Sequence, residues 1–511
     1  MERQKFIDEL SKAYNFATPS IYLGAAVLDD QVIQEVQVHL PLKTINRHGL
    51  IAGATGTGKT KTLQVMAEQL SDAGIPSLLL DIKGDLSGIA MPGEANPKVT
   101  ERMKSLGKEW LPLTNPVELL TISEQPGTRL RATVSEFGPV LLSKILGLND
   151  TQQGVLSMLF KFCDDRGLLL LDLEDLKKVL QYISEDGKFE VEKEFGSFST
   201  TSTGTILRKI IELEQQGASI FFGERSFDVE DLVRHNKAGK GIISILRVAD
   251  LQDKPKFFSS FLLQILAEIY SKFPEEGDLD KPKLVLFFDE AHLLFDEATQ
   301  ALLDQIETVI KLIRSKGVGI YFITQNPVDI PEAVLAQLGL KIQHALRAFT
   351  AKDRKAIKQA AENYPETPYY QIDQKITELG IGEAFVTALN EKGIPTPLVH
   401  TMLRAPGSRM DVLSEQEIQE LTNNSELIDY YNESIDKESA ADLLQDRYKA
   451  IEEEQPEQEP TRRSGKSTIE KVLDNSVTRQ VGRTVARELT RGILGIFGIK
   501  TTARRRTKSW F

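Results

Sequence analysis

Residues 53–60 read Gly-Ala-Thr-Gly-Thr-Gly-Lys-Thr, and they follow the short apolar run Leu50-Ile51-Ala52. The octet satisfies the pattern G-x-x-x-x-G-K-[S/T], which is typical of a loop that wraps around the phosphates of a nucleotide. The glycines allow successive backbone N–H groups to point at the phosphates, and the dipole of a following helix favours the same negative charge. The strand and helix patterns on either side favour this interpretation over a simple glycine- and threonine-rich turn.

The loop predicts a nucleoside triphosphate and Mg²⁺ as cofactors. Lys59 is expected to reach the β- and γ-phosphates, and Thr60 is expected to hold the Mg²⁺ ion. The residues that we expect to bind the nucleotide are Gly53, Ala54, Thr55, Gly56, Thr57, Gly58, Lys59, Thr60 and Lys61.

A second segment, Phe287-Phe288-Asp289-Glu290, ends an apolar run that begins near Lys283. Such a strand delivers its last side chains to the carboxyl edge of a parallel sheet, where open α/β folds bind their ligands. We expect Asp289 to support the Mg²⁺ shell and Glu290 to polarise the attacking water. An apolar run followed by Asp-Glu is also a common strand end, and it is the loop upstream that favours the catalytic interpretation.

Candidate strands at Ile242–Leu246 and at Ser77–Asp81 lie between the two motifs in the sequence. Their position favours nucleotide hydrolases with an additional strand and a catalytic glutamate over simple kinases or GTPases. Gln325 follows the next buried strand, 319–324, and is expected to sense the γ-phosphate. The alternative is an ordinary amide at a strand end.

Arg314 lies near the end of a helix that we expect over residues 299–315, shortly before the candidate helix-terminating Gly317. A cation at this position stabilises the helix by itself. The second interpretation is an arginine finger that enters the nucleotide site of a neighbouring subunit. The sequence leaves both open, and Arg314 joins Lys59, Glu290 and Gln325 as a catalytic candidate.

The alternation of strand and helix patterns predicts an α/β fold with a split nucleotide-binding core. A hairpin of 383–389 and 396–403 is expected to close one edge of its parallel sheet. The predicted parts are a short β segment (1–45), the core (46–87 and 240–406), a helical insertion (88–239), a helical extension (407–450), an acidic linker (451–460) and a basic tail (461–511).

The composition is that of an ordinary globular protein of 511 residues, with 41% hydrophobic and 27% charged residues. The sequence shows no secretory signal pattern and no apolar run of the ~18 residues that a bilayer crossing needs. Cys163 is the single cysteine, which fits a reducing compartment. We therefore expect a cytoplasmic protein without an integral membrane span.

The charge is distributed unevenly along the chain. The net charge is −12, but residues 461–511 contain thirteen Lys/Arg and three Asp/Glu, so that this tail carries +10 and the remainder −22. Apolar and arginine positions in the tail recur with helical spacing, which predicts an amphipathic basic helix. Such a helix suits nucleic-acid phosphates, an anionic membrane surface, a protein partner or the acidic body of the chain itself.

Five motifs occur in the order found in the HerA/FtsK-type ATPases, and the chain most resembles the bacterial HerA-like branch of the YjgR type. They are Gly53–Thr60, Asp81-Ile82-Lys83-Gly84-Asp85, Phe288-Asp289-Glu290-Ala291-His292, Arg314-Ser315-Lys316-Gly317 and Ile323-Thr324-Gln325-Asn326-Pro327. The resemblance covers roughly residues 20–405. It implies a RecA-like core, ATP as the nucleotide, and a hexameric ring that moves double-stranded DNA or protein substrates.

The resemblance also implies the roles of individual residues. Lys59 and Thr60 would act on the nucleotide and Mg²⁺, Asp289 and Glu290 in hydrolysis, Gln325 as a sensor, and Arg314 in the neighbouring subunit. Two departures are visible: residues 1–45 are short for the β-barrel typical of HerA proteins, and residues 407–511 match no DNA-reading module.

The leading prediction is thus a Mg²⁺-dependent ATPase that assembles as a ring and couples hydrolysis to the movement of DNA. The alternative is a regulatory or scaffold ATPase that gates a protein or membrane partner without nucleic acid.

Overall fold

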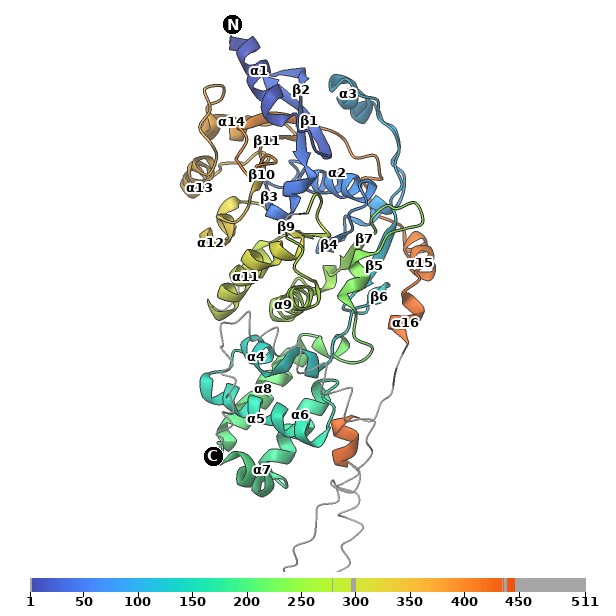
Figure 1. The fold of residues 1–511 in the computed structure, drawn as a ribbon, viewed down its shortest axis with the longest axis vertical. Coiled ribbons are helices and arrows are strands. Elements are labelled where there is room, and N and C mark those ends of the chain that lie inside the picture. Colours follow the sequence, from blue (N-terminus) through green and yellow to red (C-terminus); the bar gives the residue numbers. More distant parts are fainter. Residues whose placement is uncertain (1, 278, 296–299, 434, 436–438, 446–511) are drawn as a thin grey trace, which may run out of the picture.

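The structure is a computed structural model, and it describes residues 2–277, 279–295, 300–433, 435 and 439–445. One mixed sheet of 12 strands, in the order β2-β1-β12-β11-β10-β3-β9-β8-β4-β7-β5-β6, runs through the molecule. Helices lie on both faces of this sheet (Figure 1). The strands are β1 (Ser20–Leu28), β2 (Gln31–Pro41), β3 (Gly49–Ala52), β4 (Ser77–Asp81), β5 (Val117–Thr121), β6 (Thr128–Arg129), β7 (Ile243–Arg247), β8 (Leu284–Phe288), β9 (Val318–Thr324), β10 (Leu340–Gln343), β11 (Glu383–Thr387) and β12 (Val399–Leu403).

The helices fall into groups along the chain. Those that precede or belong to the sheet region are α1 (Glu2–Tyr14), α2 (Lys59–Asp72), α3 (Pro97–Ser105), α9 (Pro255–Lys272), α10 (His292–Phe295), α11 (Gln300–Ile313), α12 (Glu332–Leu335), α13 (Ala351–Glu362) and α14 (Ile372–Glu378). A separate helical group consists of α4 (Val134–Ile145), α5 (Asp150–Arg166), α6 (Leu173–Ser184), α7 (Lys188–Phe195) and α8 (Thr200–Gln215). Near the C-terminal end lie α15 (Glu415–Asn423) and α16 (Ile428–Asn432).

All neighbouring strands from β10 to β6 are parallel. Strand β3 lies between β10 and β9, and β9 separates β3 from β8, which confirms the predicted core with an additional strand. Every residue of β4 and β8 is buried. Side chains alternate between the two faces of the sheet. Leu79 and Phe287 therefore belong to the hydrophobic core on one face, while Leu78 and Phe288 point to the opposite face. Of these, Leu78 and Phe288 lie in the second core, with α9 and α11.

The antiparallel part of the sheet extends further than predicted. Strands β11 and β12 pair antiparallel, as expected, but β12 is not the outermost strand. Strand β1 pairs with β12, and β2 then forms the edge. The close approach of β1 to β12 depends on Gly24, because a Cβ at this position would lie 2.0 Å from the carbonyl oxygen of Met402. The N-terminal residues therefore complete the sheet.

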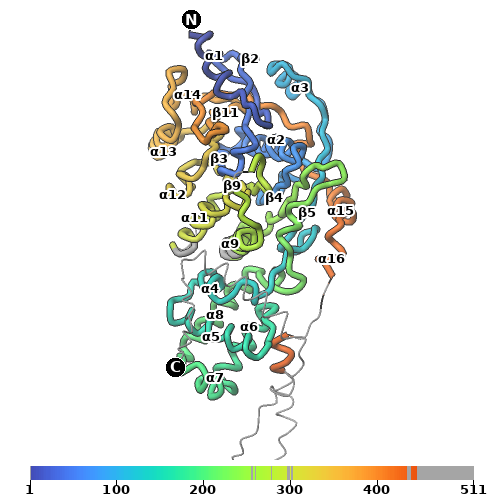
Figure 2. Tube along the Cα trace, in the orientation of Figure 1, coloured from blue at the N-terminus to red at the C-terminus, as the bar shows by residue number. Residues whose placement is uncertain are grey.

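Residues 88–239 differ from the predicted helical insertion, because they also supply strands β5 and β6. Strand β5 extends the parallel sheet beyond β7, and its buried Glu118 pairs with Arg234 at 2.9 Å. A short apolar run such as Val117–Thr121 does not distinguish a strand from a helix by periodicity alone. The helices α4 to α8 are confined to 134–215, where they lie beyond α9 and α11 on one side of the sheet (Figure 2).

The extension after residue 406 is only partly helical. Beyond α15 and α16, residues 439–445 reach the helical group, where Ala440 donates its N–H to the Leu169 carbonyl at 2.9 Å. The predicted acidic linker 451–460 and basic tail 461–511, with residues 446–450, lie outside the described residues. Among the helices that the structure describes, none combines the length and apolar character needed to cross a membrane.

We expect Gly24→Ala to destabilise the protein by about 1–3 kcal/mol, because the added methyl group meets backbone that has no room to yield. Urea unfolding measures the change. Gly154→Ala is the matched control: Gly154 lies in helix α5 and a Cβ there meets nothing within 4 Å. Alanine should stabilise this helix by about 0.5–1 kcal/mol. Equal stabilities of the two variants would contradict the close β1–β12 approach.

Candidate active site

The glycine-rich loop connects the end of β3 to the start of α2. Gly56 and Gly58 have φ values of 79° and 113°, in the left-handed region that favours glycine. A Cβ at Gly53 would lie 2.5 Å from the Cβ of His344. The loop therefore requires these glycines for its curvature and for its contact with the neighbouring strand.

Neighbouring segments hold the loop from two sides. Gly53 donates its N–H to the Thr324 carbonyl at 3.2 Å, and Ala54 donates to the Ala345 carbonyl at 2.8 Å. On the other side, Gly382 donates its N–H to the Thr57 carbonyl at 2.9 Å. The backbone N–H groups in the first turn of α2 have no intrahelical acceptor, as at every helix start. A preformed loop with free donors beside it is suited to bind phosphate.

Lys59 is the first residue of α2 and is buried. Its ammonium group donates to the Ala54 carbonyl at 3.2 Å, so that the side chain bends back over the loop. Burial, and then the charge of Lys83, lower the pKa of Lys59. Anionic phosphates would relieve both effects.

The remaining loop candidates differ in their exposure and contacts. Thr60 is partly buried in the first turn of α2, beside Lys59. Lys61 points elsewhere: its ammonium group donates to the Met410 carbonyl at 2.6 Å and to Gln64 Oε1 at 3.3 Å. A contact of Lys61 with a nucleotide would therefore come from its backbone.

Asp289 and Glu290 follow β8 directly and are both buried. Burial raises the pKa of Asp289 to about 6. Burial also acts to raise the pKa of Glu290, but the ion pair with Lys83 outweighs it and holds this pKa below its usual value. Glu290 adopts a left-handed backbone conformation with φ 46°, which non-glycine residues rarely do. Such strain is often found at functional sites.

Gln325, at the end of β9, lies beside the Glu290 carboxylate. Its Nε2 atom donates to Glu290 Oε2 at 3.4 Å, and His292 Nδ1 lies 3.2 Å from the same oxygen. The structure thus brings Gln325 and Glu290 together at the carboxyl edge of the sheet.

Lys83 is a site residue to which the sequence analysis assigned no role. It lies in the loop after β4, which Asp81 fixes by accepting backbone N–H groups from Gly84 at 2.8 Å and Asp85 at 3.1 Å. This loop places the Lys83 ammonium group on Glu290. The signal was the segment Asp81–Asp85, which was recognised as a motif but not connected to Glu290.

His344 is a second residue that the sequence analysis missed. It is fully buried behind the loop, and its Nε2 atom lies 2.9 Å from Thr62 Oγ1 on α2. Burial lowers the pKa of His344 to about 3, so the ring is neutral. Its contacts with both the loop and α2 fit a structural role, and the sequence offered only a lone histidine after a short strand.

Arg314 lies away from this edge. It precedes β9, so it stands at the amino edge of the parallel sheet, opposite the glycine-rich loop. There it lines a cavity of about 400 Å³ together with three other cations, Arg47, Lys311 and Lys341. Among the described residues that line this cavity, none is acidic.

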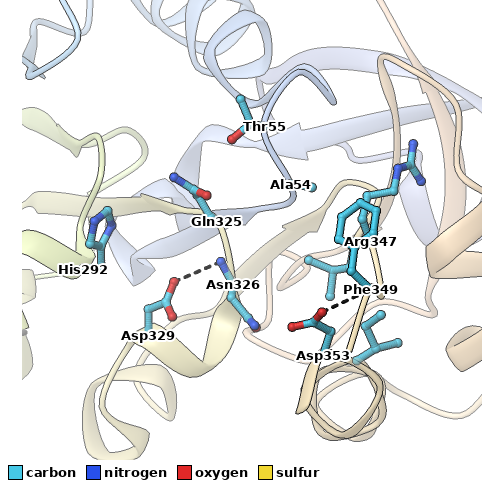
Figure 3. Close-up of a pocket in the computed structure, with 11 residues that line it drawn as sticks. Ala54, Thr55, His292, Gln325, Asn326, Asp329, Arg347, Phe349 and Asp353 are labelled. Carbon is cyan, nitrogen blue, oxygen red and sulfur yellow. Dashed lines mark hydrogen bonds between the residues drawn. The ribbon is translucent and has the colours of Figure 1, made fainter. Parts of the chain in front are cut away.

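A larger cavity of about 620 Å³ lies beside the loop (Figure 3). Gln325 and His292 line it and also contact Glu290, so the cavity lies next to the Glu290 carboxylate. Its lining residues are Ala54, Thr55, His292, Gln325, Asn326, Asp329, Leu346, Arg347, Phe349, Asp353 and Ile357. The described part of the chain has no cluster of three His, Cys, Asp or Glu side chains able to hold a metal by itself.

Comparisons with known proteins agree with this arrangement. The family model described as Helicase HerA-like C-terminal matches residues 27–464. The DNA double-strand break repair helicase HerA of Sulfolobus acidocaldarius is 24% identical over 368 residues, which cover 71% of this chain and 66% of the relative. The protein of the same name from Sulfurisphaera tokodaii is 24% identical over 385 residues, covering 74% and 68%. The chain thus spans 66% of the length of the first relative.

Solved structures share the fold at low sequence identity. The plasmid coupling protein TrwB in complex with ADP and Mg²⁺ matches with a TM-score of 0.52 at 14% identity, covering 80% of this chain and 94% of that chain. Its complex with a non-hydrolysable ATP analogue gives a TM-score of 0.51 at 15% identity, covering 80% and 95%.

The strand order, the glycine-rich loop and the two carboxylates after β8 define a P-loop domain of the RecA-like class. Because the family model spans residues 27–464, the chain belongs to the HerA-like family.

We expect Lys59→Met to weaken ATP binding by about 10- to 100-fold, which corresponds to one lost charge-assisted hydrogen bond. The fold should persist, since the hydrogen bond that the structure describes for the Lys59 ammonium group goes to a carbonyl of the loop itself. Displacement of a fluorescent nucleotide measures the affinity. Lys178→Met on the exposed surface of α6 is the matched control and should bind as the wild type does. Unchanged affinity of Lys59→Met would place the phosphates elsewhere.

Proposed function

We propose that this chain binds Mg²⁺ and ATP, hydrolyses the ATP, and works as a ring-forming motor on double-stranded DNA. The observation that carries the proposal is the convergence of the glycine-rich loop, Asp289, Glu290 and Gln325 at one edge of the sheet. Lys59 would neutralise the β- and γ-phosphates, while the loop backbone orients them.

The residues at this edge fit a Mg²⁺ ion. The Oδ2 atom of Asp289 is buried and, among the described residues, has no hydrogen-bond partner. An orphaned carboxylate oxygen is suited to hold a water of a hydrated Mg²⁺, and the Thr60 hydroxyl would be a ligand of the ion. When bound, Mg²⁺ would neutralise charge on the phosphates.

Glu290 is the residue that would accept the proton of the attacking water. Gln325 contacts the same carboxylate, so it can orient that water and respond to the terminal phosphate. The cavity beside the loop is lined by Gln325 and His292, which both contact Glu290.

We expect Glu290→Gln to lower ATP turnover by about 100-fold or more, because the amide does not accept the proton of the water. Nucleotide binding should remain. Duplex DNA at low salt should raise the wild-type turnover several-fold, and added salt should weaken this effect because phosphate contacts release counterions. Steady-state phosphate release with and without long duplex DNA measures both changes.

Glu362→Gln, an exposed change at the end of α13, is the control for the substitution, and heparin is the control for a general polyanion effect. Turnover that depends on Glu290 but ignores DNA would contradict the motor and favour an ATPase that gates another partner. Turnover that is indifferent to Glu290 would contradict the assignment of the catalytic base.

The ring part of the proposal rests on the position of Arg314. Within one chain Arg314 stands at the opposite edge from the loop, in a cavity whose charged lining residues are cations. A second copy that presents its nucleotide site to this basic face would receive Arg314 as a finger on the terminal phosphate. Repetition of this contact with a rotation that closes would give a ring, which for this family we take to be a hexamer.

We expect Arg314→Ala and Glu290→Gln to be inactive separately and to recover turnover when they are mixed. In a mixed assembly, a chain with Arg314→Ala keeps an intact Glu290 and receives Arg314 from its Glu290→Gln neighbour. Phosphate release is measured after joint refolding or subunit exchange. Each variant mixed with itself is the control, and Arg314→Lys should not substitute fully because lysine lacks the planar fork. A mixture that remains inactive although mass analysis finds mixed assemblies would show that Arg314 does not act in a neighbour.

A further inference from the structure

The ion pair between Lys83 and Glu290 joins two strands at the candidate site. Asp81 fixes the backbone of the Lys83 loop, because its carboxylate accepts N–H groups from Gly84, Asp85 and Leu86. The Lys83 side chain itself is 35% exposed, whereas that of Glu290 is 7% exposed. The loop is therefore anchored, while the Lys83 side chain is partly exposed to solvent.

Both oxygens of the Glu290 carboxylate are occupied in the nucleotide-free chain. Oε1 pairs with Lys83, and Oε2 accepts from Gln325 at 3.4 Å. A carboxylate that already serves a cation and an amide is a weaker base for water than a free one. The backbone of Glu290 is also held in the left-handed region, with φ 46°. The Glu290 carboxylate is thus restrained by its contacts with Lys83 and Gln325 and by its backbone.

The charges around Lys83 show what would release it. Lys83 interacts with Asp289 and Asp85 as well as with Glu290, and its positive charge acts unfavourably on Lys59. Lys59 on α2 and Lys83 after β4 are therefore close enough for their charges to interact. A terminal phosphate placed between them would replace the repulsion of two ammonium groups by two attractive contacts.

We propose that Lys83 is a positioning residue that restrains Glu290 in the nucleotide-free chain and transfers to the terminal phosphate of a bound nucleoside triphosphate. This inference rests on the proposed ATPase site and deepens it. The exchange frees Glu290 only when a terminal phosphate is present. ADP lacks that phosphate and leaves the Lys83–Glu290 pair intact, so Lys83 makes the site distinguish the triphosphate from the diphosphate.

The test is a double-mutant cycle on nucleotide binding, with ATPγS and ADP as probes in fluorescence displacement. Lys83→Met should weaken ATPγS by about tenfold and leave ADP unchanged, because only the triphosphate gains the charge-assisted contact. Glu290→Gln should tighten ATPγS, since Lys83 no longer has to leave a carboxylate. In the Lys83→Met background this gain should largely disappear.

Controls separate the exchange from a structural effect. Lys83→Arg keeps a cation and should retain most of the ATPγS preference, and Lys178→Met should behave as the wild type. Equal losses for ATPγS and ADP in Lys83→Met, or an equal gain from Glu290→Gln with and without Lys83, would overturn the inference. The readout is affinity rather than turnover. A chain that does not hydrolyse ATP would therefore refute the proposed function while the binding cycle still decided the role of Lys83.

Discussion

The carboxyl edge of the parallel sheet carries more negative charge than a buried surface tolerates without compensation. Burial raises the pKa values of both Asp81 and Asp289 to about 6, because it disfavours the ionised carboxylates. Buried charges persist in proteins only when they are paired or hydrogen-bonded. Here Asp81 accepts backbone N–H groups, and Lys83 supplies the counter-charge for Asp289 and Glu290. The architecture of the site follows from this balance between buried carboxylates and their partners. A bound metal ion and a bound phosphate would both change that balance of charge.

Helix α2, which begins at the glycine-rich loop, is also bound to the segment that follows β12. Glu68 on α2 is buried and accepts the N–H groups of Gly407 at 3.0 Å and Ser408 at 2.8 Å. About two turns earlier on α2, the ammonium group of Lys61 donates to the Met410 carbonyl. Later in the chain come α15 and α16, and Ala440 donates its N–H to the Leu169 carbonyl in the helical group. Side chains of α2 thus hold the segment 407–410, which follows the last strand of the sheet.

The sequence predicted those parts of the site that are contiguous or that end a strand. The loop 53–60, the pair Asp289-Glu290 and Gln325 each carry a local pattern, and all meet at one edge because parallel strands share their carboxyl ends. Lys83 lies in the motif 81–85 but that motif assigned it no role, and His344 carries no local pattern. Their roles depend on contacts with Glu290 and Thr62, residues that the chain brings close only through the sheet. The pairing of β1 with β12 likewise depends on a backbone approach at Gly24 that no periodicity reveals.

The position of Arg314 constrains how copies of this chain can associate. Strand β9 has 7 residues between Arg314 at the amino edge and Gln325 at the carboxyl edge. At about 3.3 Å per residue the two edges are about 23 Å apart, which is well beyond the reach of one arginine side chain. Arg314 therefore does not reach the nucleotide that the loop of its own chain would hold. If Arg314 acts on a nucleotide, that nucleotide belongs to a second copy, and a head-to-tail contact of this kind closes as a ring or continues as a filament when it is repeated.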